Sequence, residues 1–429
     1  MKTVRCGRWF GALILALALG LPGTALAAEF RLESDTLFRF FERETSQGKD
    51  RKAIPAYEYL QVDVGSASEP GLSIHAYGWG RLDLADDDYF DDDTAGELLY
   101  GYLEYTAKEA NFNARLGRQY IFAGVANEAV DGLRLSADLG RYFNASLYGG
   151  QPVALDSENG RDGDSIYGGR LGHRLSGWYD VGVSWKQVDN DDDLAEKMLG
   201  IDLGLYLPKG VSLYGFSSRN LETDGWGEHS YELRFRLAGV ELRPYFQQFQ
   251  FEDQFGTGAN SAPPFRFLAE TGEEIQVLGV DATWRGGETW DFGVKVKNYD
   301  YDQRDETSNY YALLATWYAA ERCSIGGEAG LMDGDADRDD YLLLRAYATW
   351  DRLPASLPLS FLTGEVVWVN YREDIYDEDT SLFLSIGAGK RFLDDALAVK
   401  LSGDFSSDPY FDHDVRGMLT VSYLLDHQN

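Results

Sequence analysis

Cysteine is almost absent from this chain of 429 residues, which contains only Cys6 and Cys323. Cys6 lies within an N-terminal export signal, so the mature chain keeps a single cysteine. One cysteine excludes disulfide bonds within the chain and zinc sites built on cysteine clusters. The haem-attachment pattern Cys-x-x-Cys-His does not occur in the sequence, which excludes covalently bound c-type haem.

Long apolar runs are missing and histidine is scarce. Beyond the signal, no stretch of about 18 uninterrupted apolar residues occurs, and this excludes a helical membrane protein. Only five histidines are present, and hydrolases of the serine–histidine type need a histidine in fixed geometry beside the serine. His75, with Ser73 on the same strand face, is the best candidate for such a pair. We nevertheless expect that the chain is not an enzyme.

The first 27 residues have the three parts of a secretory signal peptide. Lys2, Arg5 and Arg8 give a positive start, an apolar core follows, and Ala25-Leu26-Ala27 forms a small-residue cleavage site. An uncleaved anchor helix is the alternative, but the apolar core is shorter than the ~20 residues that a membrane span needs. The sequence therefore predicts a signal peptide at 1–27 and a single mature domain at 28–429.

Basic residues are few relative to acidic ones. The chain has 39 Lys and Arg against 71 Asp and Glu, a net charge of −32. Removal of the signal takes away three basic and no acidic residues, which lowers the net charge to −35. This balance argues against binding nucleic acid or an anionic lipid surface through bulk charge, and it favours cations as neighbours.

Apolar and polar residues alternate along much of the chain. Over residues 72–84, apolar side chains fall on one face of a strand and polar ones on the other, as in a sheet with one apolar side. Strands are predicted by this pattern at 30–42, 56–65, 72–84, 98–106, 112–120, 130–138, 142–150, 165–175, 178–188, 197–207, 211–220, 229–237, 240–251, 275–285, 289–299, 309–319, 324–332, 341–351, 359–371, 381–392, 397–406 and 415–425.

The connections between these segments alternate between short and long. The long ones include 151–164, 252–273 and 373–380, and the first two are long enough to fold inward. We predict an all-β fold: a transmembrane antiparallel up-and-down β-barrel of about 22 strands (range 18 to 22), with short periplasmic turns and long acidic external loops. Aromatic residues, 14% of the chain, suit the two interfaces of a bilayer. A soluble sandwich, with its apolar face inward, is the alternative.

Charged residues share one face of several predicted strands. A charge on the lipid side of a membrane strand costs a few kcal/mol, on the order of 2–4 for Lys or Arg at mid-bilayer, so this face should line the lumen. The predicted pore-lining residues are Arg81, Asp83, Glu104, Arg115, Arg134, Glu232, Arg234, Arg236, Asp291, Lys295, Lys297, Lys400 and Asp404.

One acidic segment has the spacing of a divalent-ion loop. Asp333, Asp335, Asp337 and Asp339 alternate along the chain, which makes them candidates for a weak Ca²⁺ or Mg²⁺ site. The segment has Arg338 where a calcium loop has its turn glycine, and it lacks the late bidentate glutamate. An acidic external loop is the alternative interpretation. Beyond Ca²⁺ or Mg²⁺ at such loops we expect no cofactor.

Two short segments carry a resemblance. The run from Arg115 to Gln119 (Arg-Leu-Gly-Arg-Gln) is followed by the run from Asp131 to Leu135 (Asp-Gly-Leu-Arg-Leu). This pair, over roughly residues 112–150, resembles alginate-export-type outer-membrane channels, and the whole-length pattern is similar to the superfamily of Gram-negative outer-membrane β-barrel porins. The resemblance implies a closed barrel that conducts solutes.

The leading functional prediction is an outer-membrane porin for passive diffusion of small solutes or ions, with a weak preference for cations. The alternative is a porin-like barrel that sheathes a multihaem cytochrome in an electron-transfer conduit, because barrels of about 22 strands are wide and usually plugged. Expected partners are outer-membrane lipid and lipopolysaccharide. A second copy of the chain and a multihaem cytochrome are further candidates, and nucleic acid is excluded.

Overall fold

The computed structural model describes residues 29–427 apart from 45–49, 66–69, 86–89, 91, 110, 154–162, 252, 254–272, 355 and 410. The predicted signal peptide lies outside the described residues, as do the central parts of the loops predicted at 151–164 and 252–273. Cleavage of the signal and inward folding of these two loops therefore stay predictions.

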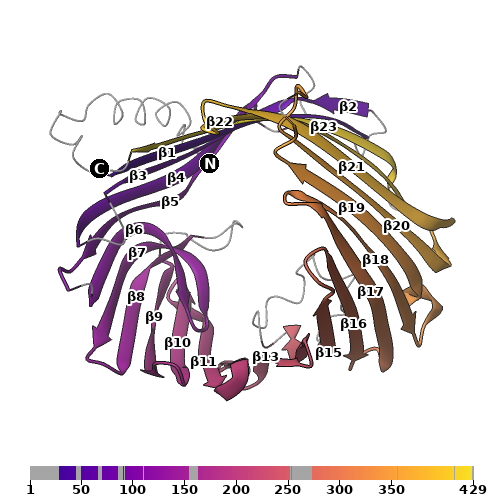
Figure 1. The fold of residues 1–429 in the computed structure, drawn as a ribbon. Helices are drawn as coiled ribbons and strands as arrows, with labels where there is room; N and C mark the ends of the chain where they lie inside the picture. Colours follow the sequence, from indigo (N-terminus) through magenta and orange to yellow (C-terminus); the bar gives the residue numbers. More distant parts are fainter. Residues whose placement is uncertain are drawn as a thin grey trace.

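The described chain is almost entirely strand, and consecutive strands pair antiparallel around one sheet (Figure 1). The strands are β1 (Phe30–Glu44), β2 (Asp50–Ala53), β3 (Pro55–Val64), β4 (Gly71–Asp83), β5 (Thr94–Thr106), β6 (Phe112–Ala123), β7 (Ala126–Leu139), β8 (Phe143–Val153), β9 (Ser165–Leu175), β10 (Tyr179–Asn190), β11 (Asp193–Leu207), β12 (Val211–Asn220), β13 (Trp226–Leu237), β14 (Val240–Gln250), β15 (Glu274–Arg285), β16 (Trp290–Tyr301), β17 (Glu306–Ala320), β18 (Cys323–Gly334), β19 (Tyr341–Asp351), β20 (Phe361–Ile375), β21 (Glu378–Phe392), β22 (Leu397–Asp408) and β23 (Phe411–His427). Within the described residues, no helix is long and apolar enough to span a membrane.

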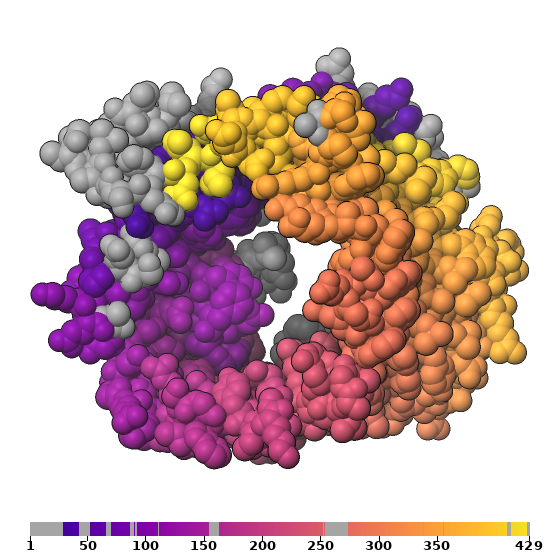
Figure 2. Space-filling model, in the orientation of Figure 1, coloured from indigo at the N-terminus to yellow at the C-terminus, as the bar shows by residue number. Residues whose placement is uncertain are grey.

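The sheet closes on itself. The first strand pairs with the last, from Phe30 opposite His427 to Phe41 opposite Arg416. β2 and β3 both pair with β1 and act as one interrupted strand, so the 23 strands make a barrel wall of 22. The prediction of a closed antiparallel barrel is confirmed. The space-filling view shows the wall as a ring around a hollow centre (Figure 2).

The two faces of this wall differ in chemistry and in crowding. Leu72 is 63% exposed while its neighbour Ser73 is 3% exposed, and Leu147 and Leu313 are 63% and 65% exposed. Glu104 and Ser184, on the other face, are each 1% exposed. Side chains converge on the concave side of a curved wall and splay apart on the convex side. The polar, crowded face is therefore the inner one, and the apolar face points outward.

One end of the barrel carries the short turns and both chain ends, here called the turn end. Trp178, Trp284, Trp290 and Trp350 lie in or beside turns at this end and are 39–56% exposed. Amphipathic rings at this level are typical of a membrane interface. Two 3₁₀ turns lie in connections between strands: η2 (Pro208–Gly210) at this end and η5 (Asp337–Asp339) at the other.

The prediction of a long loop at 373–380 is wrong. β20 and β21 continue through this segment and meet in a two-residue turn, Tyr376-Asp377, whose φ angles are 52° and 69°. Asp191-Asp192, with φ angles of 50° and 71°, is a left-handed pair of the same kind, and Gly124-Val125 is an equally short connection with a positive φ at Gly124; all three lie at the end opposite the chain termini. Left-handed pairs close hairpins without a long loop. The acidic residues of 373–380 had indicated a loop by their composition.

Candidate functional site

One hairpin leaves the barrel wall. β6 pairs with β5 only as far as Arg118 opposite Gly101, yet it continues as a strand to Ala123. It pairs with β7 along its whole length, up to Ala123 opposite Ala126. The segment 119–129, here called the hairpin tip, therefore has no partner strand on its β5 side and is free to bend away from the wall.

The hairpin tip bends into the lumen. The backbone N–H of Val125 donates to Ser184 Oγ at 3.0 Å, and Lys186 Nζ lies 2.5 Å from Glu128 Oε1. Ser184 and Lys186 belong to β10, which is separated from β7 by β8 and β9. Strands at this separation can touch only across the concave side of the wall. Figure 1 shows β6 and β7 curving toward the enclosed space.

An apolar cluster lies beneath the hairpin tip. It consists of Ile121, Ala123, Ala126, Val130, Tyr148, Ile166 and Val188, all at most 8% exposed. The first four belong to the hairpin, and the rest come from the inner faces of β8, β9 and β10. Burial of a large apolar side chain contributes about 1.5–3 kcal/mol, so this cluster holds the tip against the wall. Tyr120 and Phe122 alternate with it and are 46% and 68% exposed.

A buried charge cluster fixes the same contact. The Lys186 side chain is 5% exposed and lies 2.5 Å from Glu128 Oε1 and 2.6 Å from Glu196 Oε1. One carboxylate comes from the hairpin tip and the other from β11. A buried cation is tolerated only with partners of this kind, because an unpaired charge in such a place costs several kcal/mol. Lys186 therefore links the hairpin tip to the wall.

A row of glycines lies where the hairpin leaves the wall. Gly117, Gly132 and Gly150 are register partners on β6, β7 and β8. Gly117 has φ +128°, and a Cβ at Gly132 would lie 2.2 Å from the carbonyl oxygen of Gly149. The backbones thus approach too closely for any side chain. Gly117 and Gly132 belong to the two segments that carry the porin resemblance.

Arg118 holds the bend from the side. Its Nε and Nη2 each donate to a carboxylate oxygen of Asp131 at 2.8 Å, and its Nη1 donates to the carbonyl oxygen of Leu98 at 2.9 Å. Bidentate pairs of this geometry are among the stronger protein hydrogen bonds. Gln119, 1% exposed, donates to the carbonyl oxygens of Arg115 and Gly132.

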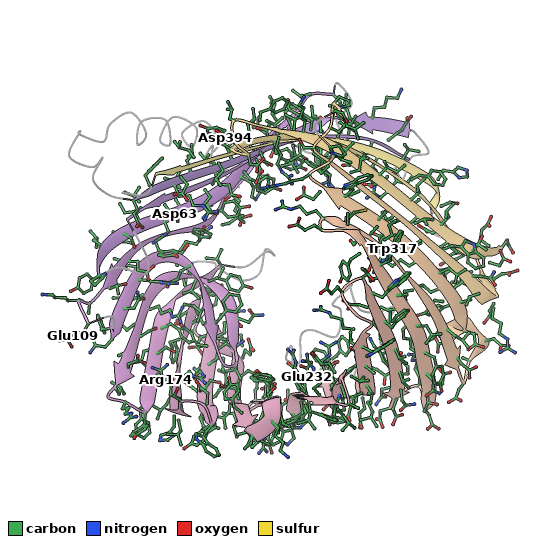
Figure 3. All side chains as sticks on the ribbon, in the orientation of Figure 1. Asp63, Glu109, Arg174, Glu232, Trp317 and Asp394 are labelled. Atoms are coloured by element: carbon green, nitrogen blue, oxygen red, sulfur yellow. The ribbon has the colours of Figure 1, made fainter. Side chains whose placement is uncertain are left out.

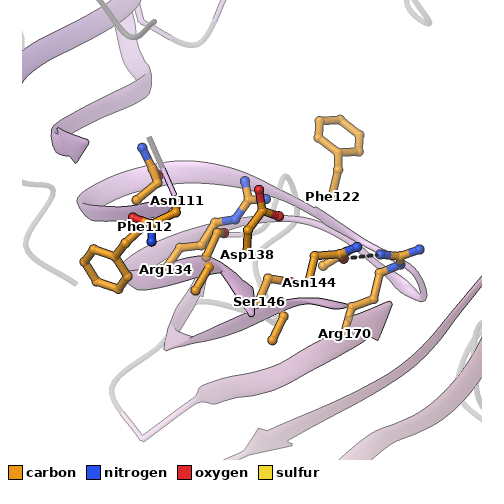
Figure 4. A pocket seen from close by; sticks show the side chains of 13 residues that line it. Asn111, Phe112, Phe122, Arg134, Asp138, Asn144, Ser146 and Arg170 are labelled. Carbon is orange, nitrogen blue, oxygen red and sulfur yellow. Dashed lines mark hydrogen bonds between the residues drawn. The ribbon is translucent and has the colours of Figure 1, made fainter. Parts of the chain in front are cut away.

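A cavity of about 270 Å³ lies between the hairpin tip and the wall (Figure 4). Arg134, Asn144, Ser146 and Arg170 line it, with Phe122 at its edge. Arg170 donates to Asn144 Oδ1 at 3.0 Å and pairs with Asp202 at 2.5 Å. The cavity combines two guanidinium groups and the Asp138 carboxylate with neutral hydrogen-bonding side chains beside an exposed ring.

Three of the predicted pore-lining residues meet on the inner face of β5, β6 and β7. Glu104 lies 3.2 Å from Arg115, and Arg115 is the register partner of Arg134. Glu104 also lies 3.5 Å from His75 Nε2. Arg134 lines the cavity beneath the hairpin tip. The sequence had grouped these residues only by strand face.

His75 connects two acidic groups and one hydroxyl. Its Nε2 lies 2.9 Å from Ser73 Oγ and its Nδ1 lies 2.6 Å from Asp63 Oδ1, the order of a serine–histidine–aspartate relay. Ser73 is only 3% exposed, and Glu104 places a negative charge beside the serine, where an oxyanion would have to form. We therefore interpret the cluster as a structural part of the wall.

The remaining predicted residues fall into two groups. On the inner wall, Arg234 pairs with Glu232, which also lies 3.7 Å from Arg243 Nε. Lys295 lies 3.3 Å from Glu328, and Lys297 lies 6.0 Å from the Tyr310 ring centroid. Lys400 and Asp404 lie on the inner face of β22 and have no ion pair within the described part of the chain. Figure 3 labels Glu232 and Asp63 on this wall.

The second group lies at the rims. Asp83 ends β4 and accepts from the backbone N–H of Ala85 at 3.1 Å, and Arg81 donates to the carbonyl oxygen of Asp92. Arg236 pairs with Glu241 at 3.3 Å, and Asp291 with Arg285 at 3.1 Å, both close to the turn end. The part that any of these residues plays in conduction stays a prediction.

Of the four aspartates proposed for a divalent ion (Asp333, Asp335, Asp337 and Asp339), three are held by other partners. Asp335 accepts from the backbone N–H and hydroxyl of Thr307 at 2.7 and 3.0 Å. Asp337 lies 3.3 Å from Arg372, and Asp339 lies 3.8 Å from Arg304. Across the described residues, no three acidic, histidine or cysteine side chains converge as metal ligands. The ion site at 333–339 stays a prediction without geometric support.

Sequence reasoning missed the hairpin tip as a structural element. It ended one strand at 120 and began the next at 130, whereas β6 and β7 continue to a turn at Gly124-Val125. The signal was present: Ile121, Ala123, Ala126 and Val130 are small or apolar on one face, opposite Tyr120 and Phe122. Glu128 and Glu196 were also missed because they fell just outside the predicted strands, and Arg170 because a charge pattern gives no register between strands that are not neighbours.

Comparison with known proteins identifies similar barrels only among solved structures. No family model matches the sequence, and no curated protein matches it. The structure of OccAB4 from Acinetobacter baumannii has a TM-score of 0.48 and 11% identity, covering 93% of this chain and 98% of that one. A BenF-like porin from Pseudomonas fluorescens Pf-5 has a TM-score of 0.47 and 11% identity, covering 93% and 98%. OccK2 from Pseudomonas aeruginosa, in complex with glucuronate, has a TM-score of 0.46 and 12% identity, covering 94% and 98%.

Proposed function

We propose that this protein is a channel of the bacterial outer membrane through which small solutes or ions diffuse passively. The observation that carries the proposal is the sorting of the closed wall, apolar outside and charged inside. An apolar outer face requires a lipid environment, and a closed barrel is one of the two structures that can cross a bilayer with every backbone group paired. A hydrated inner wall then gives solutes a path.

The hairpin tip narrows this path. It is fixed to the inner wall by an apolar cluster and by Lys186, so it occupies part of the lumen cross-section at all times. Selectivity in such channels depends on the width and the charge lining the narrowest part. The hairpin tip leaves less room for a protein in the lumen, so the inner wall gives no support to the alternative of a multihaem-cytochrome conduit.

A weak preference for cations is the finer part of the proposal. The chain carries a net charge of −32. Acidic residues, Asp191, Asp192 and Asp377, also lie in the hairpin turns at the barrel end opposite the chain termini. Acidic groups at a pore mouth raise the local cation concentration. The guanidinium groups around the cavity act in the opposite direction, and this opposition keeps the expected preference weak.

Planar-bilayer recording tests both parts. The purified full-length mature protein should insert and give stable single-channel steps in symmetric salt. In a salt gradient, the reversal potential should have the sign of weak cation selectivity. Failure to insert, with recovery of the protein in the soluble fraction without detergent, would contradict the channel. Anion selectivity would contradict only the charge preference.

A further inference from the structure

A chain of aromatic rings follows β3, β4 and β5 across the barrel wall. Its residues, here called the ring strip, are Tyr57, Tyr59, Tyr77, Trp79, Tyr100 and Tyr102. The centroids of neighbouring rings are 5.6 to 6.4 Å apart from one end of the strip to the other. All of these side chains are partly exposed. The strip is separate from the apolar cluster and the cavity at the hairpin tip.

Strand alternation places the ring strip on the lumen side. Tyr77 lies on the face of β4 that carries the buried Ser73, whereas Leu72, on the opposite face, is 63% exposed. Tyr77 is also the register partner of Tyr100 on β5. The other rings follow at every second position of the three strands. A solute that passes through the barrel therefore meets this strip.

One end of the ring strip already carries a cation from the chain itself. The guanidinium carbon of Arg115 lies 5.1 Å from the centroid of the Tyr102 ring. Separations up to about 6 Å are those of cation–π contacts. None of the cation–ring contacts in the described part of the chain involves the other rings of the strip. Those rings can therefore accept a cation from solution.

One carboxylate beside the ring strip is uncommitted. Asp35 on β1 is the register partner of Tyr59, and it lies close enough to Tyr77 to act on its hydroxyl electrostatically. Among the residues that the structure describes, Asp35 has no ion pair or hydrogen-bond partner. The other carboxylates of this face on β1 and β3 are paired, Glu33 with Arg31 at 2.9 Å and Asp63 with His75 at 2.6 Å. Asp35 therefore leaves a negative charge beside the rings.

We propose that the ring strip is a binding site for organic cations of the quaternary ammonium class, for which choline is a suitable probe. Such an ion spreads its charge over methyl groups and holds water weakly, so its transfer onto ring faces costs less than that of a small metal ion. Aromatic faces attract these cations, and Asp35 adds a Coulombic attraction. The inference rests on the proposed channel function and names the class of solute that this part of the lumen recognises.

A neutral sugar is the competing occupant, because pyranose rings also stack on aromatic faces. A sugar would gain nothing from the net charge of Asp35 and nothing from the attraction between a ring and a cation. An organic cation gains from both. The observations therefore favour the cation, and a disaccharide enters the experiment as the alternative.

Block of the open channel tests the site while the protein conducts. Choline is added at millimolar concentration to the full-length mature protein in a planar bilayer with symmetric salt. We expect the single-channel current to fall or to be interrupted in proportion to the choline concentration. Dimethylbutanol, the uncharged carbon analogue of choline, should block severalfold less, and so should maltose. Equal or stronger block by either neutral solute would overturn the assignment to cations.

Ring removal locates the block. Tyr77→Leu takes a ring from the middle of the strip and should weaken the choline block severalfold, whereas Tyr77→Phe keeps the ring and should keep the block. Tyr301→Leu, on the same face of β16 as Lys297, is the matched control, because the Arg304 guanidinium already lies 3.8 Å from the centroid of that ring. It should leave the block unchanged. Equal losses in Tyr77→Leu and Tyr301→Leu, or no loss in Tyr77→Leu, would overturn the site.

A binding measurement without conduction separates the site from the channel. Saturation-transfer NMR on the full-length mature protein in detergent should show transfer to the methyl protons of choline. The transfer should fall severalfold in Asp35→Asn and in Tyr77→Leu but not in Tyr301→Leu. Binding by a protein that passes no current would contradict the channel and leave the site standing. Current through a protein that shows no choline binding would overturn the site and leave the channel standing.

Discussion

The wall from β6 to β11 and the wall from β15 to β22 are built from the same alternating pattern, yet their inner faces differ. The first carries a bent hairpin with seven apolar residues packed at its base. In the second, Tyr310 and Ala312 are the buried apolar residues of the described strands. Strands of the same pattern thus give one inner face that is covered by a packed hairpin and one that is open to the lumen. The difference arises where β6 separates from β5.

The ion pairs of the two regions differ in the same way. The side chain of Lys186 is 5% exposed between two carboxylates, whereas that of Lys295 is 32% exposed beside Glu328. Water screens the second pair and not the first, so the second contributes at most about 1 kcal/mol. The wall from β15 to β22 is here called the plain wall. The comparison indicates that charges on the plain wall keep its inner face hydrated, while those under the hairpin tip hold the tip against the wall.

Removal of the hairpin tip should give the largest effect. Tyr120 and Ala129 are register partners, so residues 121–128 can be replaced by an Asn-Gly turn without disturbing the wall. We expect single-channel conductance to rise severalfold, because the lumen loses its inward element. Planar-bilayer recording in symmetric salt gives the measurement.

The plain wall supplies the control for this deletion. Asn370 and Thr380 are partners on β20 and β21, and replacement of residues 371–379 by the same turn shortens a hairpin that stays in the wall. Conductance should then stay near that of the unaltered protein. Equal changes from both deletions would contradict the inward position of the hairpin tip.

Lys186→Met should give the next largest effect. It leaves Glu128 and Glu196 buried without a cation, which costs about 3–5 kcal/mol of the docking free energy of the hairpin tip. We expect a noisy, higher open-channel current as the tip detaches. Lys295→Met, on the plain wall, should change stability by no more than about 1 kcal/mol. If the two variants give the same current noise, the linking role of Lys186 is wrong.

Gly132→Ala should disturb the bend. Its Cβ would lie 2.2 Å from the carbonyl oxygen of Gly149, so the strands must separate, at a cost of about 1–3 kcal/mol. At Gly403→Ala the new Cβ would meet only the carbonyl oxygen of Arg416 at 3.8 Å, an ordinary contact, so this variant should be tolerated. Heat-modifiable migration on gels, which reports barrel stability, separates them. A larger loss for Gly403→Ala would contradict the crowding at the bend.

A smaller effect concerns pH at the external end of the plain wall. The backbone N–H of Gly334 and the guanidinium of Arg372 donate to Asp340, each at 2.6 Å, and they lower the pKa of its carboxyl. A lowered pKa gives stability that is full above the unfolded pKa and is lost as pH falls through the folded one. Protection factors at residues 334–341, which are exchange rates corrected for the intrinsic pH dependence of amide exchange, should therefore fall at low pH. Asp340→Asn should remove most of that dependence, and an unchanged dependence would exclude Asp340 as its source.

The closed barrel could be predicted from the sequence because a period of two survives in nearly every strand. The face assignment of Glu104, Arg115 and Lys295 followed from the cost of charge in lipid. Strand ends were less predictable. The acidic stretch at 373–380 reads as a loop by composition, yet left-handed φ angles at Tyr376 and Asp377 turn it into a tight hairpin.

The site itself lay largely beyond prediction. The partner that Lys186 finds in Glu128 depends on the hairpin tip reaching β10. That contact joins positions 58 residues apart in sequence. The resemblance drew attention to Gly117 and Gly132, yet their part in the bend follows from backbone crowding, which no residue pattern encodes.

Cysteine accessibility tests the central claim most directly. In a Cys323→Ser background, Phe122→Cys places a thiol where the hairpin tip is 68% exposed, and Leu313→Cys places one where the outer face is 65% exposed. A charged methanethiosulfonate reagent added to the aqueous phase should lower the single-channel current of Phe122→Cys and leave Leu313→Cys unmodified. Reaction at position 313 with none at 122 would contradict a water-filled lumen narrowed by this hairpin.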